Sequence, residues 1–140
     1  MNDERLSRNI TTVILQHYPT VQAIYLFGSM ANGEEWPDSD ADLGLLLPIA
    51  EAKKKVSLLL SPCAFELAEL LGRDVDLLNL RQASTVIQHQ VVSYGKLLYV
   101  GDEYAQGEFE MYTLSLYQKL NEERAAILED FYRTKRAYRV

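Results

Sequence analysis

The pair Asp40 and Asp42 is the clearest candidate for chemistry in this sequence of 140 residues. Side chains two residues apart on a strand point to the same face, so the two carboxylates are expected to lie together. Asp76, in a later strand-like segment, can reach the same side from a neighbouring strand. Three converging carboxylates repel one another unless a cation neutralises them, and hard oxygen ligands suit Mg²⁺. The three aspartates are therefore candidate metal ligands.

A glycine–serine pair precedes the aspartates and offers a site for phosphate. Gly28 and Ser29 follow an apolar, strand-like run, and ten residues separate Ser29 from Asp40. A strand-to-helix turn leaves backbone N–H groups free to bind an anion, and glycine lets the backbone approach a phosphate closely. The Ser29 hydroxyl can add a hydrogen bond. A phosphate site beside carboxylates that hold Mg²⁺ is what phosphoryl or nucleotidyl transfer needs.

Helices and strands that alternate along the chain must position these residues. Hydrophobic periodicity and turn signals predict helices over 3–17, 51–60, 62–71, 84–94 and 102–138, and strands over 21–27, 42–47, 74–80 and 96–100. Ser61 and Ser84 are expected N-caps, and Gly72 an expected helix end. The alternation favours an α/β fold with a small mixed sheet flanked by helices. No interior linker divides the chain, so residues 1–140 are expected to form one domain.

Composition excludes several classes of protein. With 14 basic and 20 acidic residues the net charge is −6, which argues against binding nucleic acid by bulk charge. Cys63 is the only cysteine, so neither an intrachain disulfide nor a cysteine metal site is expected. The longest apolar stretch, 43–50, is too short for a membrane span, and the first residues do not read as a signal peptide. A cytoplasmic protein without membrane contact is expected.

The motif Gly28-Ser29, ten residues, Asp40-x-Asp42, followed by Asp76, resembles the nucleotidyltransferase superfamily whose core is like that of DNA polymerase β. The small size is similar to its minimal, MNT-type members, many of which are antitoxins paired with HEPN-domain ribonuclease toxins. The resemblance covers about residues 20–100. It implies a nucleotidyltransferase fold for that core, and the helical segment 102–138 fits it only loosely.

The resemblance also implies a reaction and its site residues. Asp40 and Asp42 would hold two Mg²⁺ ions that bridge the triphosphate of ATP. Asp76 would be the third carboxylate, acting on the acceptor hydroxyl or as a further metal ligand, and Gly28 and Ser29 would contact phosphate. For the antitoxin members, the implied acceptor is a tyrosine of the partner HEPN toxin, which is silenced when AMP is attached. Direct sequence-specific nucleic-acid binding is not expected.

One departure from the family pattern concerns charge. Members often carry arginines just after the glycine–serine pair, whereas this chain has Met30-Ala31-Asn32-Gly33. Lys53, Arg73 or Arg81 could supply the missing positive charge, and the sequence does not place them. Whether Asp38 or Asp74 assists at the site also stays open.

The predicted C-terminal helix carries an apolar stripe much longer than a core contact needs. Apolar and aromatic residues recur there at three-, four- and seven-residue spacing: Phe109, Tyr112, Leu116, Leu120, Ile127 and Phe131. A helix of this length is longer than a compact domain of 140 residues is wide. Two interpretations follow: a bend near residue 121 folds the helix back, or its far end meets another chain. The last residues are basic and could contact an acidic partner, or RNA held by that partner.

Two other functions are compatible with the motif. One is a small-molecule nucleotidyltransferase of the aminoglycoside-modifying type, although such enzymes usually carry an additional helical domain for the acceptor. The other is a non-catalytic antitoxin that acts by binding alone, for which three clustered carboxylates would be unnecessary. The preferred interpretation is an Mg²⁺-dependent adenylyltransferase that uses ATP and modifies a HEPN toxin.

Overall fold

The computed structural model describes residues 3–28, 40–54, 57–58 and 61–138, and the side chains of these residues up to 134. The helices are α1 (Asp3–His17), α2 (Ile49–Lys54), α3 (Pro62–Leu71), α4 (Thr85–Tyr94) and α5 (Glu103–Tyr138), with a 3₁₀ turn, η1, at Leu80–Gln82. The strands are β1 (Ala23–Phe27), β2 (Ala41–Leu46), β3 (Val75–Asn79) and β4 (Lys96–Val100). This alternation is the predicted α/β order.

The four strands form one mixed sheet in the order β3-β2-β1-β4. Strand β1 runs antiparallel to both of its neighbours, β2 and β4, whereas β2 and β3 are parallel. The parallel pair needs a crossover, and α2 and α3 lie in it between the two strands. The predicted small mixed sheet is therefore confirmed.

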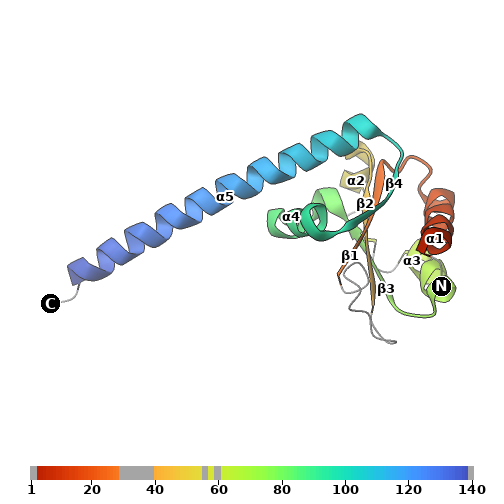
Figure 1. Cartoon of the computed structure of the whole chain (residues 1–140), viewed down its shortest axis with the longest axis horizontal. Coiled ribbons are helices and arrows are strands. Elements are labelled where there is room, and N and C mark those ends of the chain that lie inside the picture. Colours follow the sequence, from red (N-terminus) through yellow and green to blue (C-terminus); the bar gives the residue numbers. More distant parts are fainter. Residues whose placement is uncertain (1–2, 29–39, 55–56, 59–60, 139–140) are drawn as a thin grey trace.

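Helices cover both faces of the sheet (Figure 1). On one face, alternate strand residues such as Ile24, Leu43 and Leu77 pack with residues of α1 and α3. On the other face, Tyr25 and Leu46 pack with residues of η1, α4 and α5. Because strand side chains alternate, Asp42 and Asp76 point to the second face, the one that carries α4 and α5.

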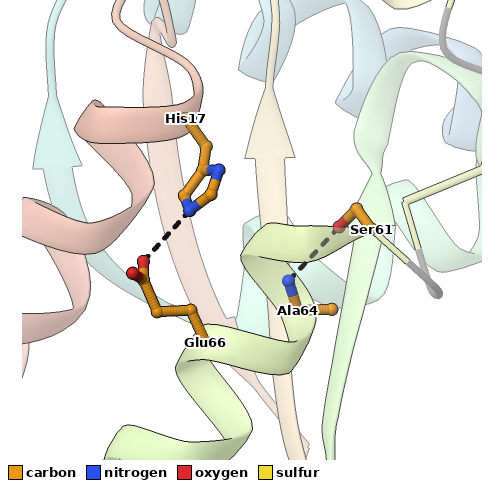
Figure 2. Close-up of polar contacts among 4 residues, drawn as sticks. All are labelled: His17, Ser61, Ala64 and Glu66. Atoms are coloured by element: carbon orange, nitrogen blue, oxygen red, sulfur yellow. Dashed lines mark hydrogen bonds and ion pairs between the residues drawn. The ribbon is translucent and has the colours of Figure 1, made fainter.

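Local signals fix the ends of the helices. The Ser61 hydroxyl accepts a hydrogen bond from the Ala64 N–H at 3.2 Å at the start of α3 (Figure 2). Gly72 ends that helix with a φ of +66°. Nearby, His17 at the end of α1 lies 3.0 Å from a carboxylate oxygen of Glu66 on α3, which joins the two helices on this face (Figure 2). The predicted caps at Ser61 and Ser84 are both present.

Helix α5 is one continuous element of 36 residues that extends far beyond the body of the molecule (Figure 1). At 1.5 Å per residue it is about 54 Å long. Near its start, Phe109 and Thr113 are buried, whereas every described side chain from 121 to 134 is exposed. The suggestion that a bend near residue 121 folds the helix back is therefore wrong. Nothing in that segment breaks the helix, because it contains neither proline nor glycine.

One predicted helix is shorter than expected. Residues 51–60 were expected to be helical, but α2 spans Ile49–Lys54 and residues 57–58 are not helical. Leu58 is buried in the core on the α1 and α3 side, and its carbonyl accepts hydrogen bonds from the backbone N–H and hydroxyl of Ser61. The turn that buries Leu58 and caps α3 is incompatible with a helix running to residue 60.

Candidate active site

The candidate site lies at one end of the sheet, where the register aligns three strands. Phe27, the last residue of β1, pairs with Asp42 of β2, and Asp42 pairs with Asp76 of β3. Gly28 follows Phe27 directly, and Asp40 precedes β2 by one residue. The register therefore brings Gly28, Asp42 and Asp76 together across more than 30 residues of sequence, as the spacing predicted.

The carboxyl group of Asp42 is the electrostatic centre of this site. Burial first, then the charge of Asp76, a hydrogen bond shared with the Asp76 carboxyl and the charge of Asp40 raise the pKa of Asp42 to about 6. Asp42 is half-buried, while Asp40 and Asp76 are exposed. Two carboxyls in contact, with a third close enough for its charge to act, form an all-oxygen donor set that a hard divalent cation would neutralise.

The three carboxylates do not converge as closely as the sequence suggested. Within the described ranges, no three His, Cys, Asp or Glu side chains are already arranged to hold a metal ion. Asp42 and Asp76 contact each other, and Asp40 lies at the exposed edge of the pair. The assignment of all three as metal ligands therefore stays a prediction, with Asp42 and Asp76 as its central pair.

Gly28 is required at the site for two reasons. Its φ is +76°, a backbone conformation that side chains with a Cβ rarely adopt. A Cβ at this position would lie 2.3 Å from Oδ2 of Asp42, which is closer than any real contact. The absence of a side chain thus lets the turn after β1 lie against the carboxylate, as a glycine beside a bound phosphate would need to do.

A pocket of about 560 Å³ opens beside Asp42 and Asp76. Apolar side chains, among them Phe27, Leu58 and Ile87, form part of its wall. Neutral amides supply most of its other polar groups: Asn79 at the end of β3, Gln82 in η1 and Gln90 in α4 line it together with Ser57. Such a pocket is suited to a ligand that is flat or apolar, uncharged, and able to form hydrogen bonds.

The sequence did not single out these amides. Asn79 is almost fully buried and donates a hydrogen bond from Nδ2 to the carbonyl of Ala52 at 3.0 Å. A buried amide three residues after a candidate catalytic aspartate is a signal that could have been noticed. Gln82 and Gln90 carry no such signal, because only the packing of η1 and α4 beside β3 brings them to the pocket.

Several predicted residues fall elsewhere. Ser29 and Asp38, together with the segment from Met30 to Gly33, lie outside the described residues. Asp74 is exposed just before β3, and its backbone carbonyl accepts from the Ala41 N–H at 2.9 Å. Its side chain is not among those that shift the pKa of Asp42.

Arg81 does not replace the missing arginines. Its guanidinium donates to the carbonyl of Leu47 at 2.5 Å and to Oε1 of Gln22 at 2.6 Å, and it lies 6.0 Å from the ring centre of Phe109. These contacts commit Arg81 to the packing of η1 against β2 and α5. The candidate phosphate site must therefore draw positive charge from another source.

Comparison with known proteins agrees with this geometry. The family model described as polymerase beta, nucleotidyltransferase matches residues 9–104. The protein adenylyltransferase MntA of Shewanella oneidensis is 38% identical over 128 residues, which is 91% of this chain and 88% of that protein. No helix among the described residues is both long and apolar enough to cross a membrane.

Two solved structures are similar over nearly the whole chain. A toxin–antitoxin complex with AMP-PNP contains a chain that matches 94% of this chain and 99% of its own length, with 35% identity and a TM-score of 0.69. A complex of a tri-AMPylated Shewanella oneidensis HEPN toxin with an MNT antitoxin matches 91% of this chain and 97% of its own, with 34% identity and a TM-score of 0.65. The fold and the motif of this chain, together with these matches, show that it belongs to the polymerase β-like nucleotidyltransferase family.

Proposed function

We propose that this protein is an antitoxin that transfers AMP from ATP to a tyrosine hydroxyl of a partner HEPN ribonuclease toxin and thereby neutralises it. The proposal draws on the similarity to an MntA adenylyltransferase and to MNT antitoxins bound to a HEPN toxin. The observation that carries it in this chain is the alignment of Gly28, Asp42 and Asp76 at one end of the sheet. That alignment places Gly28, whose backbone can approach a phosphate closely, beside the paired carboxylates of Asp42 and Asp76.

Mg²⁺ would be held as two ions by Asp40, Asp42 and Asp76. The raised pKa of Asp42 supports this assignment, because burial first and then the charges of Asp76 and Asp40 disfavour its ionised form, which a bound cation would stabilise. When bound, the metal would neutralise triphosphate charge and orient the phosphates for displacement. The chain's own part is to supply oxygen ligands from adjacent strands whose backbones are fixed by the sheet.

The remaining groups have distinct roles in the proposed transfer. The backbone at Gly28, with Ser29, would contact phosphate. The part of the pocket that is lined by apolar side chains and neutral amides would accept a flat ligand beside the carboxylates. The tyrosine oxygen forms a bond to the α-phosphorus as the bond to the β-phosphate oxygen breaks, and pyrophosphate leaves. Asp76, which is exposed and therefore accessible to the acceptor, would take the proton of the tyrosine hydroxyl.

The direct test is to mix the protein with its HEPN partner, ATP and Mg²⁺ and to measure intact masses. We expect the partner to gain the mass of one or more AMP units, and ribonuclease activity to fall in parallel. Asp40→Ala combined with Asp42→Ala should abolish transfer while the complex still forms. An unmodified partner in a confirmed complex with the wild-type protein would overturn the proposal.

Among the residues that the structure describes, no feature favours either alternative. Small-molecule nucleotidyltransferases of this type usually carry an additional helical domain for the acceptor, whereas the described residues after β4 form the single helix α5. A protein that acts by binding alone would gain nothing from repelling carboxyls such as Asp42 and Asp76. Binding without modification nevertheless remains one outcome of the mass measurement.

A further inference from the structure

A protein acceptor needs a docking surface outside the pocket. The pocket beside Asp42 and Asp76 has a volume of about 560 Å³, which is the size of a small-molecule site. A specific protein complex usually buries about 800 Å² on each partner, far more than one inserted side chain provides. The affinity for the acceptor protein must therefore come from another surface on the same side of the molecule.

The exposed half of α5 continues a face that is buried in the first half. Phe109 and Thr113 are 7% and 1% exposed, because they pack on the sheet and α4. Ile127 and Phe131 are in step with them at multiples of three and four residues, which places all four on one face of the helix. Yet Ile127 and Phe131 are 67% and 57% exposed, since α5 has by then passed the edge of the body (Figure 1).

The face of α5 that packs on the body near Phe109 thus stays apolar further along the helix, where no described part of the body covers it. Leu128 and Tyr132 flank the stripe and are 55% and 63% exposed. A solvated helix would carry polar residues on all sides, and a large apolar stripe without a partner in its own chain usually marks an interface. We define the docking arm as residues 120–134 of α5, with Leu120, Ile127, Leu128, Phe131 and Tyr132 as its apolar stripe.

The docking arm lies on the same side of the sheet as the candidate active site. Ile87 and Gln90 of α4 line the pocket, and the neighbouring His89 stacks on Tyr117 of α5 with ring centres 3.6 Å apart. Helix α4 therefore connects one wall of the pocket to the base of the arm. A protein bound under the arm and against the end of α4 would lie next to the opening beside Asp42 and Asp76.

Charge and the solved complexes indicate what occupies the arm. Beyond residue 131 the chain has four basic residues and no acidic one, whereas the preceding part carries all 20 acids. Within the arm, four acids outnumber Arg124 and Arg133, so the positive charge is confined to its last residue pair and the helix beyond it, which carries Lys135 and Arg136. That basic end favours a partner surface with an acidic border. In addition, the match to a chain of the toxin–antitoxin complex spans 94% of this chain. The unmatched residues are too few to account for all of α5, so the match includes most of this helix. The long helix therefore has a counterpart in the toxin-bound state.

We infer that the docking arm binds the acceptor protein itself, through a surface on that protein that is apolar and bordered by acidic residues. This inference rests on the proposed function for the identity of the acceptor. The arm would hold the partner beside the active site, so that it sets the affinity for the acceptor while Asp42 and Asp76 set the rate of transfer.

The test compares substitutions on two faces of the same helix. Ile127→Glu and Phe131→Glu place a charge in the stripe, and Met111→Glu is the matched control. Met111 is also apolar and exposed, at 73%, but lies sixteen residues before Ile127, about four and a half turns, on nearly the opposite face. All three positions are exposed, so the variants should keep the wild-type melting temperature, which circular dichroism would check.

We expect the two stripe variants to bind the HEPN partner at least about tenfold more weakly in calorimetric titration, with Met111→Glu unchanged. In AMP transfer, KM for the partner should rise by a similar factor, while KM for ATP and kcat at saturating partner stay near wild type. Wild-type affinity in both stripe variants would overturn the inference. So would weaker binding in Met111→Glu alone, because it would place the interface on the other face.

Two further outcomes separate this inference from the proposed function and from self-association. If the wild-type protein transfers no AMP but the stripe variants still lose the partner, the proposed function fails and the docking arm stands. Light scattering of the isolated protein tests the other occupant, a second copy of this chain. A wild-type dimer that Phe131→Glu converts to a monomer without weakening partner binding would overturn the assignment of the arm to the acceptor.

Discussion

At the scale of single residues, the site depends on what two positions lack. Gly28 has no side chain, and a Cβ there would collide with Asp42. Asp42 has no cationic partner among the groups that shift its pKa, so its carboxyl is destabilised by its neighbours. The first feature avoids strain and leaves room beside Asp42, whereas the second lowers the stability of the protein alone and favours a cation beside the carboxylates.

The first prediction compares two glycines with positive φ. Gly28→Ala and Gly72→Ala should each lose about 1 kcal/mol of stability from backbone strain. Only Gly28→Ala should also lose AMP transfer, because a Cβ at Gly72 meets no atom within 4 Å whereas one at Gly28 meets Asp42. Urea denaturation and transfer assays would measure both effects. Full activity in Gly28→Ala would contradict the close packing of this turn on the carboxylate.

The second prediction concerns the repulsion at Asp42. In buffer with a chelator at pH 8, Asp42→Asn should melt at a higher temperature than the wild-type protein, because it removes a charge held against Asp76 and Asp40. Added Mg²⁺ should raise the melting temperature of the wild-type protein and have little effect on the variant. Asp74→Asn is the control, since Asp74 is exposed and does not act on Asp42. Equal responses in both variants would argue against a cation site at Asp42.

A third prediction uses the single thiol. Cys63 is fully buried, and burial raises the pKa of its thiol to about 12, with a smaller contribution from the charge of Glu66. The native protein should therefore resist thiol reagents up to about pH 9, because the thiolate is the reactive form. Labelling should occur only as the protein unfolds in denaturant. Rapid labelling of the native protein at pH 8 would show that Cys63 is accessible, contrary to its burial.

At the scale of elements, one polar cluster fixes α5 on the sheet. The hydroxyl of Tyr25, in the middle of β1, donates to Oε1 of Glu110 at 2.9 Å and accepts from Nε2 of Gln106 at 3.1 Å. Gln106 also donates to Glu110 at 2.7 Å. These three side chains hold the start of the helix at a defined position on β1, and the direction of the docking arm follows from that anchor.

The fourth prediction tests this anchor. Tyr25→Phe removes a buried hydroxyl and should lower the free energy of unfolding by about 1 kcal/mol or slightly more, because Glu110 and Gln106 lose a partner. Tyr112→Phe, at a ring that is 66% exposed on the same helix, should change it little. Urea denaturation measures both variants, and equal losses would show that the cluster does not stabilise the contact. Transfer activity should survive, since Tyr25 lies outside the candidate site.

At the scale of the whole molecule, charge is distributed unevenly. Most of the acids, including those of the site, precede the far half of α5, which still carries Glu122, Glu123, Glu129 and Asp130. The last residues of α5 are basic, with Arg133, Lys135 and Arg136 and no acid after Asp130. The net charge of −6 therefore hides a positive end that lies far from the acidic body (Figure 1). Separated charges of this kind steer association and act mainly on its rate.

The fifth prediction follows from this separation. Lys135→Gln with Arg136→Gln should slow association with the acceptor several-fold at low salt, and the difference should shrink as salt increases. Lys53→Gln with Lys54→Gln removes the same charge from α2 and should slow it less. Stopped-flow or surface binding measurements give the rates. Equal slowing by both pairs would mean that overall charge, rather than the end of the helix, governs encounter.

The sequence by itself indicated the family and most of the elements, and it predicted the chemistry of the site. The spacing of Gly28, Asp40 and Asp42, with Asp76 on a later strand, indicated the family, because the reaction needs those residue types at fixed positions on strands. The helix caps at Ser61 and Ser84 could be predicted from the sequence, because a cap acts on residues close to it in the chain. The end of α2 could not be predicted from the sequence, because it depends on the burial of Leu58 in the core, which only the tertiary structure shows.

Only the tertiary structure decided how these parts are arranged. The register joins Asp42 to Asp76, and packing of η1 and α4 brings Gln82 and Gln90 to the pocket, neither of which local sequence encodes. Packing likewise commits Arg81 to Phe109 and away from phosphate. The apolar stripe of α5 was visible in the sequence, but whether it is core or interface depends on where the body ends. Periodicity reports which residues share a face, and only the fold determines what that face meets.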